Sequence, residues 1–209
     1  MKRPICLWMT SRSRSSLVSK IFANHGVWWG NTYATTKGYQ MYENQNIKRI
    51  QKEIIKPKKG ILPFCEELEL TEEVVNKFHE SLERYISQQM QSITTARGKW
   101  SMKTGVEYFN AWKDLNPYNV FIKRDPDGVA KSIVEKGIGG YQQALAATHW
   151  RYNYMDRIQD RYGGVFVNTD KIINGDYTDI KQAIAYCGIE YSKPYVEKSI
   201  NGRPNFYDN

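Results

Sequence analysis

The chain has 209 residues, and its composition of 41% hydrophobic, 13% aromatic and 25% charged residues is that of a folded globular protein. This composition excludes disordered and collagen-like chains, and no apolar run reaches the roughly 20 residues that cross a bilayer. Thirty Lys and Arg against 22 Asp and Glu give a net charge of +8, which favours polyanionic partners without choosing among nucleic acid, nucleotides and anionic substrates. We expect a single domain over residues 1–209, a length that one core can serve.

The amino-terminal segment and the cysteines predict a cytoplasmic protein. Polar residues directly follow the apolar residues 5–9, which are too few for the hydrophobic region of a secretory signal. Cys6, Cys65 and Cys187 are odd in number and far apart, which indicates free thiols in a reducing compartment. Three histidines and three cysteines without ligand spacing predict no metal site.

The first half of the chain predicts one strand and three helices. Residues 5–9 form a short apolar run ended by a polar loop, which is typical of a buried parallel strand. Apolar residues at helical spacing follow from 17 to 22, and Gly26 is placed to end this helix after Asn24 and His25. A second helix is predicted near residues 46–55, with no strand between 28 and 59. Thr71 caps a third helix, whose apolar stripe runs from residue 74 to 86.

The second half repeats the order of strand, turn and helix. Residues 120–122 form an apolar strand, and Asp125 and Pro126 after it form a strong helix start. A long helix is predicted at residues 141–161, a third strand at 165–167, and a last helix at 178–187 that Gly188 closes. Alternating elements of this kind predict a three-layer α/β/α fold around a central parallel sheet.

The loop between the first strand and the first helix, residues 10–16, contains hydroxyl groups and two arginines. Ligands of open parallel sheets bind beyond the carboxyl ends of the strands, where helix N-termini attract anions. The loop is therefore a candidate site for phosphate or a similar oxyanion; the alternative is a solvated polar turn whose serines cap the helix. It lacks the glycines and the lysine of a nucleoside triphosphatase P-loop, which argues against ATP or GTP hydrolysis.

Two segments resemble motifs of the sulfotransferase family. Ser11-Arg12-Ser13-Arg14-Ser15-Ser16-Leu17 is similar to the family's 5′-phosphosulfate loop. The strand that leads into Arg124-Asp125-Pro126, with Ser132 eight positions after Arg124, is similar to its 3′-phosphate motif. Shorter similarities to the bacterial branch of the family are Gly26-Val27, Tyr42-Glu43-Asn44 and Trp100-Ser101-Met102-Lys103. The resemblance implies a sulfotransferase fold of the P-loop NTPase-like type.

The resemblance also implies a sulfuryl donor, 3′-phosphoadenosine 5′-phosphosulfate. Arg124 and Ser132 would bind the 3′-phosphate of this nucleotide, and the loop would bind its phosphosulfate. The loop residues concerned are Ser11, Arg12, Ser13, Arg14, Ser15 and Ser16. Arg14 replaces the glycine of the family's loop, so either its side chain turns outward or the pocket differs.

Four residues are candidates for the catalytic groups. Arg12 occupies the family's position for stabilising charge on the departing nucleotide, and Lys103 resembles a basic residue near the donor. The alternatives are a surface Arg12 paired with a carboxylate and a surface Lys103 beside a strand. Glu43 is the first candidate for the general base and His25 the second. Glu43 is alternatively a solvated carboxylate at a helix start, and His25 a C-terminal helix cap.

The function indicated is transfer of a sulfuryl group from this donor to a hydroxyl or amine acceptor. The alternatives are a non-catalytic binder of nucleotide or nucleic acid on the same fold and, less favoured, a P-loop kinase that acts on a small molecule. Nucleic acid is not expected as a partner, because no helix-turn-helix, basic zipper or zinc module is visible. The acceptor cannot be read from the sequence, and residues 28–59 and 136–143 are expected to form its pocket.

Overall fold

A four-stranded parallel sheet lies at the centre of the protein. The computed structural model describes residues 2–33, 41–55 and 67–201. Its strands are β1 (Ile5–Met9), β2 (Ser101–Gly105), β3 (Tyr118–Lys123) and β4 (Val165–Asn168), in the order β2-β1-β3-β4. Neighbouring strands pair in parallel throughout. The predicted α/β fold with a parallel sheet is therefore confirmed.

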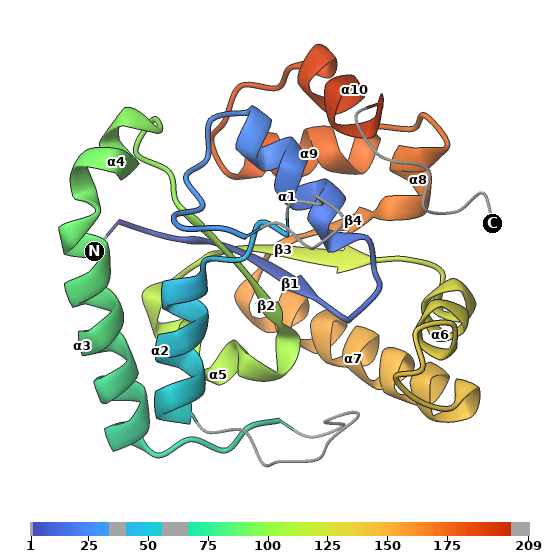
Figure 1. Ribbon diagram of the computed structural model, residues 1–209, viewed down its shortest axis with the longest axis horizontal. Helices are drawn as coiled ribbons and strands as arrows, with labels where there is room; N and C mark the ends of the chain where they lie inside the picture. Colours follow the sequence, from blue (N-terminus) through green and yellow to red (C-terminus); the bar gives the residue numbers. More distant parts are fainter. Residues whose placement is uncertain (1, 34–40, 56–66, 202–209) are drawn as a thin grey trace.

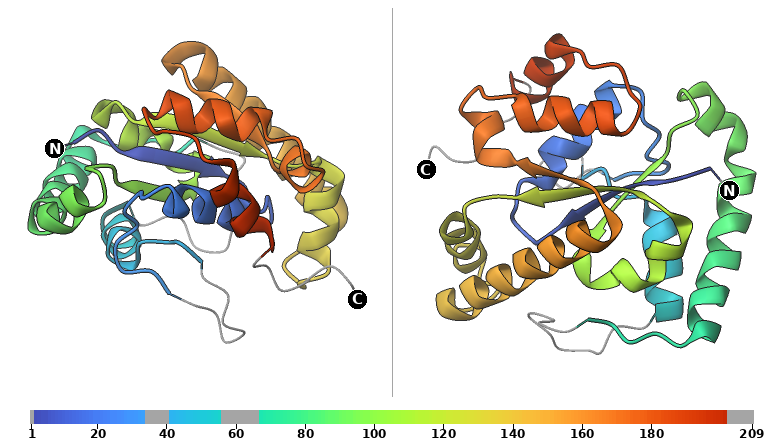
Figure 2. Two further views of the ribbon diagram at one scale, coloured as in Figure 1. Left: turned by 90° about the horizontal axis from the view of Figure 1, so that it is seen from above. Right: turned by 180° about the vertical axis from the view of Figure 1, so that it is seen from behind.

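Helices cover both faces of the sheet, as Figures 1 and 2 show. The helices on one face are α1 (Ser15–Asn24), α8 (Thr169–Ile173), α9 (Thr178–Tyr186) and α10 (Lys193–Asn201). Those associated with the other face are α2 (Gln45–Ile55), α3 (Glu72–Gln88), α5 (Phe109–Trp112) and α7 (Tyr141–Tyr162). The short α4 (Met90–Thr95) follows α3, and α6 (Pro126–Val134) lies beyond the end of β3. Two single-turn helices, Val106–Tyr108 and Lys113–Leu115, flank α5.

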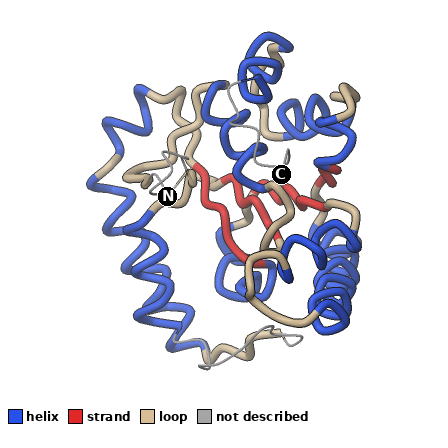
Figure 3. The backbone as a smooth tube through the Cα atoms, turned by 45° about the vertical axis from the view of Figure 1, so that its right-hand side comes forward, coloured by secondary structure: helices blue, strands red, loops and turns tan. Residues whose placement is uncertain are grey.

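Side-chain alternation along the strands produces two separate cores. Ile5 and Leu7 of β1 pack in the cluster beneath α1 and α9, whereas Cys6 and Trp8 pack in the cluster beneath α7. Because strand side chains alternate between faces, an apolar run such as β1 is stable only when both faces are covered. The three layers visible in Figure 3 provide this cover.

The helices with clear end signals begin and end where the sequence predicts. Gly26 has φ +85 and ends α1, and the Thr71 hydroxyl accepts a hydrogen bond from the N–H of Val74 at the start of α3. Asp125 accepts a bond from the N–H of Gly128, and Pro126 occupies the first turn of α6. A capping side chain satisfies an N–H group that the helix itself leaves unpaired, which is why such residues define helix starts.

The sequence analysis missed β2 and the helices α4, α5, α8 and α10, and its count of three strands is wrong. β2 contains Ser101, Lys103 and Thr104, so it lacks the apolar run that identified the other strands. Cys6 and Cys187 are buried free thiols, and Cys65 lies outside the described residues. Among the described helices, none combines the length and the apolar character that a membrane span requires.

The strand order places a topological switch point between the carboxyl ends of β1 and β3. From β1 the chain goes to β2 on one side, and from β2 it crosses to β3 on the other side of β1. The connections that leave β1 and β3 therefore diverge to opposite sides. Open α/β sheets bind their ligands at the carboxyl ends of the two strands where such a divergence occurs. Both loops with candidate binding residues begin here.

Candidate functional site

The loop after β1 makes a tight turn into α1. Arg12 and Arg14 both have left-handed backbone conformations, with φ of +66 and +57. The Ser13 hydroxyl is buried and donates to the carbonyl oxygen of Thr10 at 2.8 Å, which closes the turn. Arg14 is the N-cap of α1 and accepts a bond from the N–H of Leu17 at 2.9 Å. The first N–H groups of α1, at Ser15 and Ser16, therefore follow directly on the turn at the carboxyl edge of the sheet, and a helix N-terminus favours anions.

Arg14 does adopt the backbone conformation for which glycine is suited. Its side chain lies against α8, where its guanidinium forms an ion pair with Asp170. With 13% of the side chain exposed, it is directed sideways rather than outward into solvent. Of the two possibilities that the sequence analysis left open, the side chain turns away, toward α8 and not into solvent.

The second loop meets the first. Arg12 Nε donates to the hydroxyl of Ser132 at 3.0 Å, and Arg124 Nη1 donates to the carbonyl oxygen of Arg12 at 3.2 Å. Ser132 is buried in α6 and Arg124 follows β3 directly. The structure thus brings Arg12, Arg124 and Ser132 together at the carboxyl ends of β1 and β3, whereas Ser11 is an exposed residue of the first loop.

Tyr152 of α7 fixes the backbone of Arg124. Its hydroxyl accepts a bond from the N–H of Arg124 at 2.9 Å and donates to the carbonyl oxygen of the same residue at 2.8 Å. Burial raises the pKa of Tyr152 to about 12, so the hydroxyl keeps its proton at physiological pH. Sequence reasoning missed this contact because Tyr152 lies 28 positions away in an aromatic-rich helix.

Lys103 reaches the first loop from β2. Its Nζ donates to the hydroxyl of Ser16 at 3.0 Å and to the carbonyl oxygen of Met41 at 2.7 Å, and it lies 3.5 Å from Glu43 Oε1. Only 3% of Lys103 is exposed, so the surface alternative for this residue is wrong. Burial lowers its pKa to about 8, although the Glu43 carboxylate opposes that shift.

Glu43 is also buried, and two lysines surround its carboxylate. Oε2 pairs with Lys48 and accepts a bond from the Tyr33 hydroxyl at 3.3 Å, while Oε1 faces Lys103. Burial acts to raise the pKa of Glu43, but the charges and hydrogen bonds of Lys103 and Lys48 outweigh it and hold that pKa below its usual value. The solvated alternative for Glu43 therefore does not hold, and the carboxylate stays ionised next to Lys103.

The structure does not bring His25 to this site. It is the C-cap of α1, about 15 Å from the start of that helix by the helical rise of its ten residues. Its Nδ1 donates to the carbonyl oxygen of Ile21 at 2.7 Å, and its Nε2 accepts from the N–H of Ser192 at 3.0 Å. Both ring nitrogens are bound to the backbone, as the capping alternative requires.

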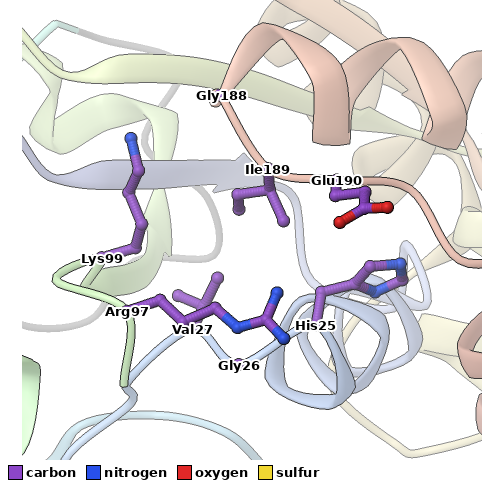
Figure 4. Close-up of a pocket in the computed structure, with 8 residues that line it drawn as sticks. All are labelled: His25, Gly26, Val27, Arg97, Lys99, Gly188, Ile189 and Glu190. Carbon is purple, nitrogen blue, oxygen red and sulfur yellow. The ribbon is translucent and has the colours of Figure 1, made fainter. Parts of the chain in front are cut away.

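A small pocket lies beside His25, at the amino end of the sheet (Figure 4). Arg97, Lys99 and Glu190 also line it. Its volume of about 90 Å³ is below the roughly 300 Å³ at which ligand pockets begin, so it does not fit a nucleotide. Within residues 2–33, 41–55 and 67–201, no three His, Cys, Asp or Glu side chains form a group that could hold a metal ion.

Thr169 and Asp170, at the start of α8, are further site residues that sequence reasoning missed. The Thr169 hydroxyl lies within hydrogen-bond distance of the carbonyl oxygens of Ser13 (3.1 Å) and Lys123 (3.2 Å). Asp170 accepts a bond from the N–H of Asp125 at 2.7 Å in addition to its ion pair with Arg14. The sequence Asn168-Thr169-Asp170 after a strand is a helix-start signal that could have drawn attention to this turn.

Two solved structures share the overall arrangement. A sulfotransferase domain from the curacin biosynthetic pathway aligns with 97% of this chain and 79% of its own length, with a TM-score of 0.57 and 10% identity. The protein has a sulfotransferase-like fold. A sulfotransferase domain from the Synechococcus PCC 7002 olefin synthase aligns with 99% of this chain and 83% of its own, with a TM-score of 0.56 and 13% identity. No protein-family model and no curated protein matches the chain, so the likeness concerns the sulfotransferase-like fold alone.

Proposed function

We propose that the protein is a sulfotransferase that moves a sulfuryl group from 3′-phosphoadenosine 5′-phosphosulfate to a hydroxyl or amine acceptor. The observation that carries this proposal is the convergence of Arg12, Arg124 and Ser132 at the carboxyl ends of β1 and β3. The two anion-binding motifs are far apart in the chain but contact each other in the fold. The sulfotransferase-like fold supports the same assignment.

The residues present suit a doubly charged nucleotide. The start of α1 supplies N–H groups and the hydroxyls of Ser15 and Ser16 for a phosphosulfate. The Thr10 hydroxyl, at the end of β1, is buried and has no hydrogen-bond partner among the described residues, as expected of a group that a ligand completes. Arg124 and Ser132 supply a guanidinium and a hydroxyl for the 3′-phosphate.

Charge stabilisation is the chemistry that this site can supply. The donor contributes a sulfuryl group whose bond from sulfur to the 5′-phosphate oxygen breaks as the acceptor oxygen or nitrogen bonds to sulfur. Arg12 belongs to the loop that would hold that phosphate, and Lys103 contacts Ser16 of the same loop from β2. Cationic hydrogen-bond donors at these places would stabilise the growing negative charge. Glu43 is the candidate to take the acceptor proton, and its lowered pKa keeps it ionised at neutral pH.

Isothermal titration with adenosine 3′,5′-bisphosphate, the desulfated product, tests the proposal. We expect the bisphosphate to bind much more tightly than adenosine 5′-monophosphate, because only the bisphosphate engages Arg124 and Ser132. Arg124→Ala should weaken bisphosphate binding by roughly 10- to 100-fold, the cost of a charge-assisted hydrogen bond, and leave monophosphate binding nearly unchanged. Arg161→Ala is the matched control, because Arg161 is exposed near the end of α7 and contacts the Tyr162 ring.

Two results would contradict the proposal. Absence of bisphosphate binding at millimolar ligand rejects the donor, and equal affinity for the two nucleotides rejects the 3′-phosphate site. Transfer of labelled sulfate from the donor to a panel of hydroxyl and amine acceptors then separates an enzyme from a non-catalytic nucleotide binder, which would bind without turnover.

Part of the expected acceptor region, residues 34–40 and 56–59, lies outside the described residues.

A further inference from the structure

Asp170 connects three parts of the candidate site through one carboxylate. Oδ1 forms the ion pair with the Arg14 guanidinium and lies 3.8 Å from Arg124 Nε. Oδ2 accepts the hydrogen bond from the N–H of Asp125, the N-cap of α6. A single negative charge therefore faces one arginine from each of the two anion-binding loops.

The backbone around Asp170 holds it rigidly. The side chain of Asn168 caps α8 by accepting from the N–H of Asp170 at 2.9 Å. The neighbouring Thr169 is fully buried, and its hydroxyl contacts the carbonyl oxygens of Ser13 and Lys123. The turn between β4 and α8 is thus fixed to the ends of both β1 and β3, and the carboxylate has a defined place between the loops.

Arg14 needs such an anchor because of its position. It is the N-cap of α1, directly before the N–H groups that would receive a phosphosulfate. A long side chain at this position has enough reach to cover those N–H groups. The ion pair with Asp170 directs the guanidinium toward α8 instead.

We propose that Asp170 is a positioning residue of the donor site, which holds the Arg14 side chain away from the start of α1 and so leaves the anion-binding turn accessible. This inference rests on the proposed function. A glycine at position 14 would leave the space in front of α1 open because it has no side chain. With arginine at this position, the ion pair with Asp170 keeps the same space open. Asp170 touches no reacting atom and acts through Arg14.

A double-mutant cycle tests the inference, with adenosine 3′,5′-bisphosphate as the ligand and titration calorimetry as the readout. The four proteins are the wild type, Asp170→Asn, Arg14→Gly and the double variant. Removing the Asp170 charge makes the site more positive whether residue 14 is arginine or glycine. The informative quantity is therefore a ratio: the change in Kd that Asp170→Asn causes with Arg14 present, divided by the change that it causes in the Arg14→Gly protein. We expect Asp170→Asn to be at least fivefold more harmful with Arg14 present than with glycine at position 14.

Each outcome decides a separate point. A ratio near one means that Asp170 acts independently of Arg14, as a merely structural residue would. This result overturns the inference but not the proposed function. A wild type that binds no bisphosphate overturns the proposed function and the inference with it. If Asp170→Asn does not fold, as thermal melting would show, Asp170→Ser provides a second cycle with the same expected ratio.

Discussion

Lys103 is a buried lysine whose charge is sensitive to pH near neutrality. Burial lowers its pKa to about 8, and the nearby Glu43 carboxylate only partly restores it. Lys103 is therefore mostly protonated below pH 8 and mostly neutral above it. Since its Nζ donates to Ser16 on the candidate phosphosulfate loop, this change of charge occurs at the site itself.

We predict that the affinity for adenosine 3′,5′-bisphosphate is highest below pH 8 and falls by roughly tenfold between pH 7 and pH 9.5, as Lys103 loses its proton and its charge-assisted hydrogen bond. Titration calorimetry at half-unit steps of pH measures this curve. Lys103→Arg is the control, because an arginine stays charged over the whole range and its curve should stay flat.

Glu43→Gln provides an independent check of the same assignment. Without the carboxylate, burial acts on Lys103 unopposed, so the midpoint of the affinity curve should move below that of the wild type. A midpoint that does not move, or a Lys103→Arg curve that still falls near pH 8, would assign the titration to another group.

At the scale of elements, the helix caps of α3 and α6 can be compared directly. Asp125 accepts from the N–H of Gly128 at 2.8 Å, whereas Thr71 accepts from the N–H of Val74 at a longer 3.4 Å. We predict that Asp125→Ala lowers the free energy of unfolding by about 1 kcal/mol and that Thr71→Ala lowers it by less. Urea denaturation measures both changes as shifts of the midpoint at an unchanged slope.

The double cap variant is the internal control. Because α3 and α6 lie at opposite ends of the molecule (Figure 1), the two losses should add to within about 0.5 kcal/mol. A Thr71→Ala cost greater than that of Asp125→Ala would contradict the link between bond length and stability.

The elements that the sequence could predict are those with local signals. Thr71, the Asp125-Pro126 pair and Gly26 specify helix ends through contacts within a few residues, and β1 is an apolar run covered on both faces. β2 has no such signal. Its buried Lys103 depends on partners that are distant in the chain, among them Glu43, 60 positions away, and the strand itself depends on pairing with β1. The five-residue α8 is too short for a helical stripe to be visible.

The residues of the candidate site likewise fall into those with a local sequence signal and those without one. Arg12, Arg124 and Ser132 stand in two short motifs, so the sequence could propose them before the structure brought them together. Tyr152, Thr169 and Asp170 act through contacts that span between 28 and 156 positions of the chain. Contacts of that kind follow from the order of the strands, and the sequence specifies the strand order only through the complete fold.

At the scale of the whole molecule, the net charge of +8 attracts any polyanion, whereas the proposed site at the carboxyl ends of β1 and β3 should discriminate among anions. The two effects respond differently to salt. Screening over about 10 Å at 0.1 M salt shortens to about 3 Å at 1 M, which removes the long-range attraction but leaves contacts between partly buried groups largely intact.

We predict that raising the salt concentration weakens the binding of both adenosine 3′,5′-bisphosphate and a single-stranded oligonucleotide, and weakens the oligonucleotide far more. Nucleic acid depends on neutralising many phosphates at once, so its affinity falls steeply with salt. The ratio of the bisphosphate affinity to that of adenosine 5′-monophosphate should stay nearly constant, because in the proposed function Arg124 and Ser132 would contact the extra phosphate at short range. Titrations in low and in about 0.5 M salt measure both quantities. A ratio that collapses toward one at high salt would mean that the charge of the whole molecule, and not the proposed site, holds the nucleotide.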